Sequence, residues 1–214
     1  MQAKPILIFI GKFLLAFIIL SAIYQYVLNK PYTKLFGGTV KMMYNGAFGK
    51  DGKRDVLLPG DENNTTEQVR AFLLDDKMIQ QYQQARAAGQ NVQFKPPVVN
   101  IDTWIQAGIY LVFFLSLVIA TAIDWKRALI AIGIGLLILH FFLVIKTGLR
   151  LQFEAANQGI GGTSLQGFGG SVLTFVYNLF RLANFNLLIA LLLWLFLAFR
   201  MEDFEKIKQK LWHV

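Results

Sequence analysis

Four long apolar runs restrict the fold of this 214-residue chain more than any other feature. They cover residues 6–28, 104–123, 129–145 and 182–199. Each is close to the roughly 17–25 residues that a helix needs to cross the hydrocarbon core of a bilayer. Only 16% of the residues are charged, against about 25% in a typical soluble domain, and none of the runs alternates with the period of a barrel strand. We therefore predict an all-α integral membrane protein with four transmembrane helices.

The runs divide the chain into seven predicted segments. These are a first transmembrane helix at 1–28, an extracytoplasmic region of mixed structure at 29–102, transmembrane helices at 103–123 and 128–146, a glycine-rich outer loop at 147–170, an interfacial segment with the fourth transmembrane helix at 171–200, and a cytoplasmic amphipathic tail at 201–214. The first helix could be mistaken for a secretory signal. Because Ser21-Ala22-Ile23 is a poor cleavage site, we expect this helix to be retained.

The short connections predict the orientation. Lys12 lies early in the first helix, Lys126 and Arg127 lie in the turn between the second and third helices, and several lysines follow the fourth. The other short loop carries only Arg150. Since basic residues favour the cytoplasmic side, both termini are predicted to be cytoplasmic in a multi-pass protein of the inner or plasma membrane. The region 29–102 is too long for this rule and is assigned to the outside by parity.

The turn at 124–127 is very short, which makes the second and third helices antiparallel neighbours. Ala131 and Gly135 form a small-xxx-small pair on the third helix. Such pairs let two helix backbones approach closely in lipid, so this face is predicted to contact another helix.

The region 29–102 is the only long stretch outside the apolar runs. Its glycines predict a short strand or hairpin within 35–48. A helix is predicted over 65–88, beginning at a threonine cap and stopped by Gly89. Pro96-Pro97 predicts an extended lead into the second transmembrane helix.

One polar group near the predicted outer ends of the third and fourth helices could bind an anion. Asn178, Arg181 and Asn184 are spaced by three and would share a helical face, with Lys146 and Arg150 nearby. The planar guanidinium of arginine suits a lipid phosphate, a lipid-carried glycan or an acidic residue of a partner.

An alternative for Arg181 is structural. It could pair with Glu154 or Asp102, or extend its charged end to the membrane interface. We expect His140 to hydrogen-bond a neighbouring helix, because no Asp or Glu lies in the apolar runs to form a proton relay with it.

The sequence predicts no catalytic, cofactor or metal site. The absence of cysteine excludes disulfides, thiolate zinc sites and a cysteine nucleophile. The glycines between 159 and 170 lack the lysine of a phosphate-binding loop, so they predict a flexible or tightly turning connector.

The tail at 201–214 places apolar side chains on one face of a helix. Phe204, Ile207 and Leu211 form this face, and Trp212 is an aromatic candidate for the membrane interface. A tail on the cytoplasmic leaflet and a solvated basic tail both fit this pattern.

In layout and general sequence texture, the chain resembles the small four-span accessory membrane proteins encoded beside bacterial exosortases. The resemblance implies an accessory role in sorting surface proteins or exporting polysaccharide. The expected function is therefore a non-enzymatic membrane subunit that presents region 29–102 to a partner. The expected partners are membrane lipids and another membrane protein or a second copy, and no nucleic acid is expected. Two alternatives remain: an enzyme or carrier acting on an anionic lipid or lipid-linked substrate at the outer leaflet, and a small channel or transporter.

Overall fold

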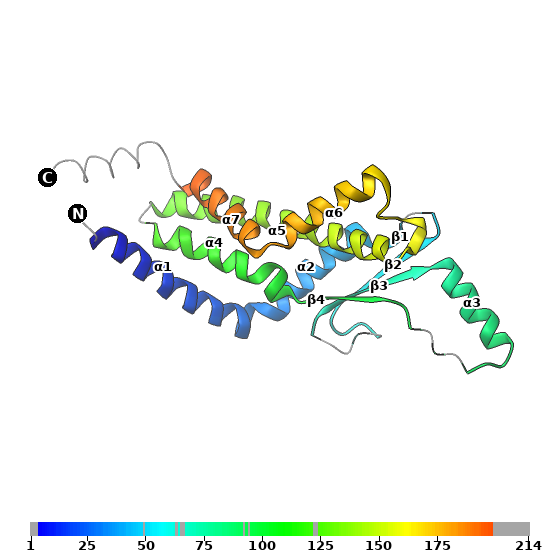
Figure 1. Ribbon diagram of the computed structural model, residues 1–214. Helices are drawn as coiled ribbons and strands as arrows, with labels where there is room; N and C mark the ends of the chain where they lie inside the picture. The colour runs from blue at the N-terminus through cyan, green and yellow to red at the C-terminus, as the bar shows by residue number, and fades with distance from the viewer. Residues whose placement is uncertain are drawn as a thin grey trace. The chain divides into compact units, whose positions relative to one another are not determined.

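The computed structural model describes residues 4–48, 50–62, 64, 67–91, 93, 95–121 and 124–198 (Figure 1). The protein is mostly helical and carries one small sheet, in agreement with a helical fold that has a mixed region. The chain forms two compact units. The first contains Met1–Asn29, Ala107–Phe142 and Leu182–Val214, and the second contains Lys30–Gln106 and Leu143–Arg181.

Helix α4 (Ile109–Ala120) lies at the centre of the first unit. It packs against α1 (Lys4–Ile23) and α7 (Ala183–Ala198), and its Phe114 lies against Gly135 of α5 (Trp125–Asn157). Eight of its residues are buried: Tyr110, Leu111, Val112, Phe114, Ser116, Leu117, Val118 and Ala120. Ala131 and Gly135 are both buried, so the small-residue face predicted on this helix does point into the bundle.

The helices around α4 expose apolar side chains on their outer faces. Leu7 of α1 is 64% exposed, Ile130 of α5 is 62% exposed and Phe196 of α7 is 76% exposed. Water does not favour such surfaces over several helices, whereas lipid does. The outer surface of this unit therefore has the apolar character of a membrane-embedded bundle.

Among the described residues, two helices are long and apolar enough to cross a membrane, and a third span results if α6 (Gly167–Arg181) and α7 are counted as one broken helix. These two are Ile6–Tyr44 and Trp125–Asn157. The predicted second span is shorter than expected, because the π-helical turn η2 (Trp104–Gly108) and α4 together cover only Trp104–Ala120.

The start of α1, the end of α4 and the end of α7 meet at one end of the first unit (Figure 1). The rings of Phe9 and Trp194 lie 6.1 Å apart, and Trp194 Nε1 donates a hydrogen bond to Thr121 Oγ1 at 2.8 Å. Arg127 Nη2 donates to the backbone carbonyl of Ala198 at 2.7 Å. The end of α4 and the first turn of α5 therefore lie beside the last turn of α7.

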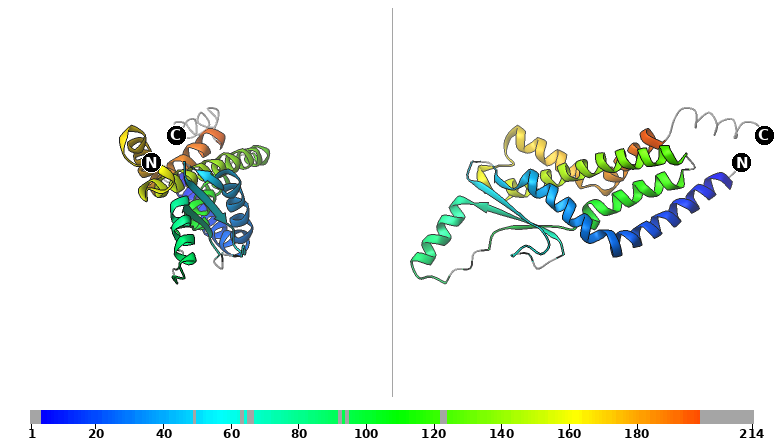
Figure 2. Two further views of the ribbon diagram at one scale, coloured as in Figure 1. Left: turned by 90° about the vertical axis from the view of Figure 1, so that its right-hand side faces the viewer. Right: turned by 180° about the vertical axis from the view of Figure 1, so that it is seen from behind.

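The second unit contains a four-stranded antiparallel sheet in the order β1-β2-β3-β4. The strands are β1 (Gly46–Phe48), β2 (Gly52–Leu57), β3 (Val69–Asp75) and β4 (Val98–Ile101). Val56 pairs with Ala71, and Val69 pairs with Ile101, so the buried side chains of three strands share one face. Helix α2 lies alongside the strands (Figure 2).

The prediction of a strand or hairpin in 35–48 is wrong for most of that segment. The π-helical turn η1 (Tyr24–Leu28) leads directly into helix α2 (Asn29–Tyr44), and only β1 is extended. Gly37 does not form a turn. It lets α2 approach the sheet, because a Cβ there would lie 2.6 Å from side-chain atoms of both Leu58 and Val69.

The helix predicted over 65–88 begins later than expected. Residues 69–75 form strand β3, in which Val69, Ala71 and Leu73 alternate as buried residues. Helix α3 (Asp76–Ala87) begins after Asp75, whose carboxylate accepts a hydrogen bond from the backbone N–H of Lys77 at 2.7 Å. The threonines proposed as caps lie outside the described residues. The predicted stop is confirmed, because Gly89 has a positive φ of 72° just beyond the helix.

The outer loop predicted over 147–170 is mostly helical. Helix α5 continues to Asn157, a 3₁₀ turn η3 follows at Ile160–Gly162, and α6 begins at Gly167. The carbonyl of Gly161 accepts from Lys50 N at 3.1 Å, and its N–H donates to Asp75 Oδ2 at 3.3 Å. The glycines thus form a tight turn that is docked on the sheet, which is the second of the two predicted forms.

Candidate functional site

The structure does not gather the predicted anion-binding residues on one helical face. Lys146 and Arg150 lie one turn apart on α5, and both are half-buried. Asn178 and Arg181 are exposed on α6, whereas Asn184 lies on α7. The continuous helix on which the shared face of Asn178, Arg181 and Asn184 was predicted is interrupted, because α6 ends at Arg181 and α7 begins at Ala183, so a common anion site of these residues stays a prediction.

The proposed structural partners of Arg181 are also not found within the described part of the chain, where Arg181 forms no ion pair with Glu154 or Asp102. Asp102 instead accepts hydrogen bonds from the backbone N–H groups of Trp104 at 2.9 Å and Ile105 at 3.2 Å. This carboxylate therefore caps the helical turn that leads into α4. The four candidate interface residues of the tail, Phe204, Ile207, Leu211 and Trp212, lie outside the described residues.

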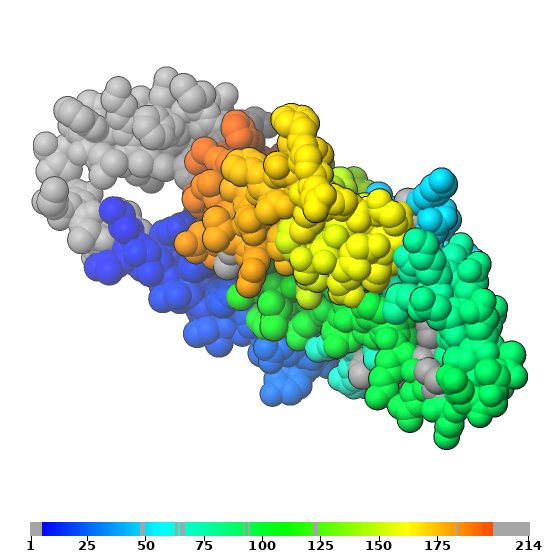
Figure 3. Space-filling model, turned by 45° about the vertical axis from the view of Figure 1, so that its right-hand side comes forward, coloured from blue at the N-terminus to red at the C-terminus, as the bar shows by residue number. Residues whose placement is uncertain are grey.

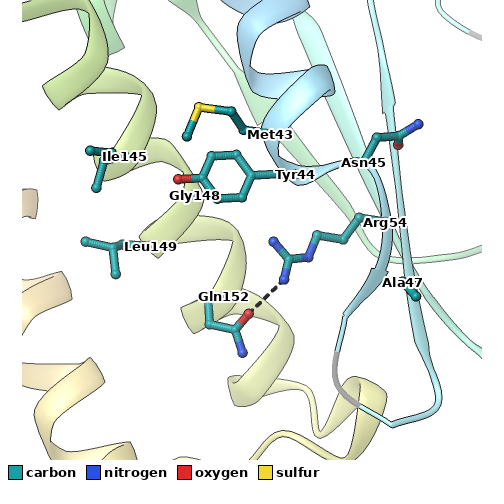
Figure 4. Close-up of a pocket in the computed structure, with 9 residues that line it drawn as sticks. All are labelled: Met43, Tyr44, Asn45, Ala47, Arg54, Ile145, Gly148, Leu149 and Gln152. Atoms are coloured by element: carbon teal, nitrogen blue, oxygen red, sulfur yellow. Dashed lines mark hydrogen bonds between the residues drawn. The ribbon is translucent and has the colours of Figure 1, made fainter.

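A pocket of about 330 Å³ lies within the second unit, where α2, β1, β2 and the later part of α5 meet (Figure 4). Its polar lining comes from Tyr44, Asn45, Arg54 and Gln152. Its apolar lining comes from Met43, Ala47, Ile145 and Leu149. Pockets of this size hold small ligands or parts of larger ones.

Arg54 is the one charged residue among the described residues that line this pocket. In β2, Gly52, Arg54 and Val56 point to the same face of the sheet, and Arg54 pairs with the buried Leu73. The strand alternation therefore turns this arginine toward the buried side. Its burial lowers the pKa of the guanidinium, which the phenol of Tyr44 partly offsets, and an arginine side chain still remains protonated.

Two neighbours hold the Arg54 guanidinium in place. Its Nη2 donates a hydrogen bond to Gln152 Oε1 at 2.9 Å, and the guanidinium carbon lies 5.9 Å from the centre of the Tyr44 ring. Figure 4 shows the guanidinium pointing from β2 toward Gln152 on α5. The ring of Tyr44 lies where a side chain at Gly148 would be, so this glycine makes room for it.

The pocket was not predicted from the sequence. An arginine on the buried face of a strand is a recognisable signal, because charged groups are seldom turned inward without a reason. That signal depends on recognising strand β2, which the sequence analysis did not do.

A second polar contact joins α2 to the loop after β2. Asp61 Oδ2 accepts from the backbone N–H of Leu58 at 2.8 Å and from Lys41 Nζ at 3.1 Å. The backbone hydrogen bond from Leu58, followed by the hydrogen bond from Lys41, holds the pKa of the Asp61 carboxyl below its ordinary value. This contact stabilises the loop around the ionised carboxylate.

The lowered pKa of Asp61 predicts a dependence of stability on pH. Because the folded protein favours the ionised form, its contribution should be present above the ordinary value of 3.8 and lost as the pH falls through the lower pKa of the folded protein. We expect the difference in thermal midpoint between wild type and Asp61→Asn to shrink in that range. Glu62→Gln, at the exposed neighbouring carboxylate, removes the same charge. An equal effect of Glu62→Gln would contradict a specific role for Asp61.

No protein-family model, curated protein or solved structure matches the chain. The resemblance to exosortase-associated proteins therefore stays a prediction. Among the residues that the structure describes, no group of three or more His, Asp or Glu side chains is placed to hold a metal ion.

Proposed function

We propose that the chain is an integral membrane accessory subunit with four crossings, which presents its sheet-bearing unit to a partner protein outside the cytoplasm. The observation that carries this proposal is the contrast within the first unit between a buried central helix and an apolar outer surface. Helix α4 is buried along most of its length, while α1, α5 and α7 expose leucine, isoleucine and phenylalanine. This is the arrangement expected of a bundle whose solvent is lipid.

The short length of Trp104–Ala120 is compatible with a crossing. Seventeen residues of helix extend about 26 Å at 1.5 Å per residue, which is near the roughly 30 Å of the hydrocarbon core. A central helix surrounded by three others can also be shorter than its neighbours, because they shield its ends from lipid. These points favour counting α4 as the second of four spans.

The proposed orientation has both termini in the cytoplasm. The start of α1, the start of α5 and the end of α7 lie at one end of the first unit. Lys126 and Arg127 lie in the first turn of α5, and Lys12 is exposed two turns into α1. Basic residues gathered at one end of a bundle favour the cytoplasmic side.

Helix α3 is the surface best suited to a partner. None of its residues is buried, and it lies at the surface of its unit (Figure 3, blue-green). Its outer side carries Gln80, Gln81, Gln83 and Gln84, all of them exposed. Side-chain amides both donate and accept hydrogen bonds, so this row suits a polar protein surface.

Topology can be tested with single cysteines, since the native chain has none. Cysteines at Lys53 and Gln166 should react with a membrane-impermeant thiol reagent in intact cells, and a cysteine at Lys126 should react only after permeabilisation. All three positions are exposed, so lack of reaction would reflect the membrane and not burial. Labelling of position 126 in intact cells would overturn the proposed orientation.

Partner binding can be tested with a photo-crosslinking amino acid at Gln83. We expect a discrete adduct with one protein, whereas the same amino acid at Ile130, on the apolar outer face of α5, should give lipid adducts. The identity of the protein attached at Gln83 also tests the expected role in surface-protein sorting or polysaccharide export. Adducts with lipid alone at both positions would contradict presentation of α3 to a partner.

A further inference from the structure

We propose that the pocket between Tyr44, Arg54 and Gln152 binds the phosphate group of a phosphate ester. This site is separate from the surface of α3 and from the residues around Arg181, and it does not depend on the proposed accessory role. It is built from side chains of α2, β2 and the part of α5 after Phe142, and these residues belong to the second unit.

The polar part of the described lining offers several hydrogen-bond donors. Arg54 supplies a guanidinium, Tyr44 supplies a hydroxyl, and Gln152 supplies an amide NH₂, because its Oε1 already accepts from Arg54. Among the described residues that line the pocket, there is no Asp or Glu. A ligand here should therefore be an anion that accepts several hydrogen bonds.

Arg54 is prepared for such a ligand before it binds. The guanidinium is half-buried, and its contacts with Gln152 and the Tyr44 ring fix its direction. An arginine held in this way loses little side-chain entropy when an anion arrives, and its planar donors match phosphate oxygens in pairs. Partial burial also strengthens the attraction relative to an arginine in open water.

Phosphate fits the donor set better than carboxylate does. A carboxylate presents two oxygens, which one guanidinium can satisfy alone. The hydroxyl of Tyr44 and the amide of Gln152 would then have no role, whereas a phosphate ester presents further oxygens to them. The volume of about 330 Å³ leaves room for part of the esterified group as well.

The apolar side of the pocket bears on the source of the phosphate. Met43 is 44% exposed and Ile145 is 48% exposed, and both line the pocket. Apolar side chains beside a phosphate site suit the glycerol and acyl parts of a phospholipid. A soluble phosphate ester would use the same donors and leave these two side chains uncovered.

The test uses the full-length chain purified in a maltoside detergent, which carries no phosphate. Dihexanoyl phosphatidic acid and glycerol 3-phosphate are titrated separately, and binding is measured by calorimetry. We expect saturable binding of one equivalent. Tighter binding of the lipid identifies a membrane phospholipid as the source, whereas equal affinities identify a soluble phosphate ester. If neither compound binds, the proposal is overturned.

Variants then assign the binding to this pocket. Arg54→Met should weaken binding at least tenfold, and Arg54→Lys should restore part of it, because the charge returns without the planar donors. Arg70→Met is the matched control. Arg70 lies on the neighbouring strand β3 but on the opposite face of the sheet, where it contacts the ring of Phe72. This control should bind within about twofold of wild type.

Two variants with smaller changes to the pocket decide the result if Arg54→Met does not fold. Tyr44→Phe and Gln152→Ala each remove one donor and should weaken binding about threefold. Thermal midpoints check that each variant is folded. Wild-type affinity in folded Arg54→Met, or in both smaller variants, overturns the proposal. Equal weakening by Arg70→Met also overturns it, because net charge would then explain the binding.

Discussion

Replacing Gly135 with leucine should destabilise the helix bundle by about 3 kcal/mol, at the upper end of what overpacking a core ordinarily costs. A Cβ at this position would overlap the ring of Phe114, which is fully buried in the central helix α4. We expect the ring to yield little, since it is fully buried and Leu111, Leu117 and Val118 of the same helix are buried with it. The helices must therefore separate to admit the new side chain. Unfolding by a graded series of detergent mixtures would measure this loss.

Gly133 provides the matched control on the same helix. It is exposed, and nothing lies within 4 Å of a Cβ added there. Gly133→Leu should be neutral or stabilising by up to about 1 kcal/mol, because leucine favours a helix over glycine. Equal loss of stability in the two variants would show that helix formation, and not the contact with Phe114, decides the outcome.

Replacing Gly37 with leucine should destabilise the second unit by a similar amount, about 3 kcal/mol. Its Cβ would lie 2.6 Å from side-chain atoms of Leu58 and Val69, and Val69 is fully buried in strand β3. The helix would be pushed away from the sheet. Hydrogen exchange should become faster in β2 and β3, whereas the bundle around α4 should keep its protection.

The adjacent Gly38 is the control for Gly37. Nothing lies within 4 Å of a Cβ at Gly38, so Gly38→Leu should leave exchange in β2 and β3 unchanged. The two glycines are neighbours in the sequence and differ only in the side of α2 that they occupy. Faster exchange in both variants would contradict the packing of α2 on the sheet through Gly37.

The parts of the fold that depend on local pattern were predictable from the sequence. The apolar runs at 6–28 and 129–145 are helical, and Ala131 and Gly135 face the inside of the bundle as their spacing predicts. The stop at Gly89 was also predictable, because its backbone conformation favours glycine. Each of these features depends on residues that are close to it in the sequence.

The parts that depend on distant contacts were not predictable. The glycine pair at 37–38 is typical of a turn, yet it lies inside a helix because Leu58 and Val69 need the space beside Gly37. Strand β3 forms where a helix was expected, since its alternate residues pair with β2 and β4. Tertiary packing overrides local preference in both segments.

The candidate site was also not predictable, because it depends on distant contacts. Arg181 was singled out for its spacing to Asn184, but the helix breaks at Leu182, an apolar residue with no local signal for a break. Arg54 drew no attention, because its direction depends on the pairing of β2 with β3. The pocket forms only when α2, β2 and α5 come together. Arg54 and Gln152, which are hydrogen-bonded there, lie 98 positions apart in the sequence.

The two edges of the sheet are poorly suited to joining further strands. Strand β1 has three residues and β4 has four. Pro96 and Pro97 precede β4, and the carbonyl of Pro97 accepts a hydrogen bond from Leu73, but neither proline has an N–H to offer to a newcomer. Copies of this protein are therefore kept from polymerising edge to edge. Any partner that docks on this sheet must recognise its side chains, because the short edge strands offer few backbone groups for hydrogen bonding.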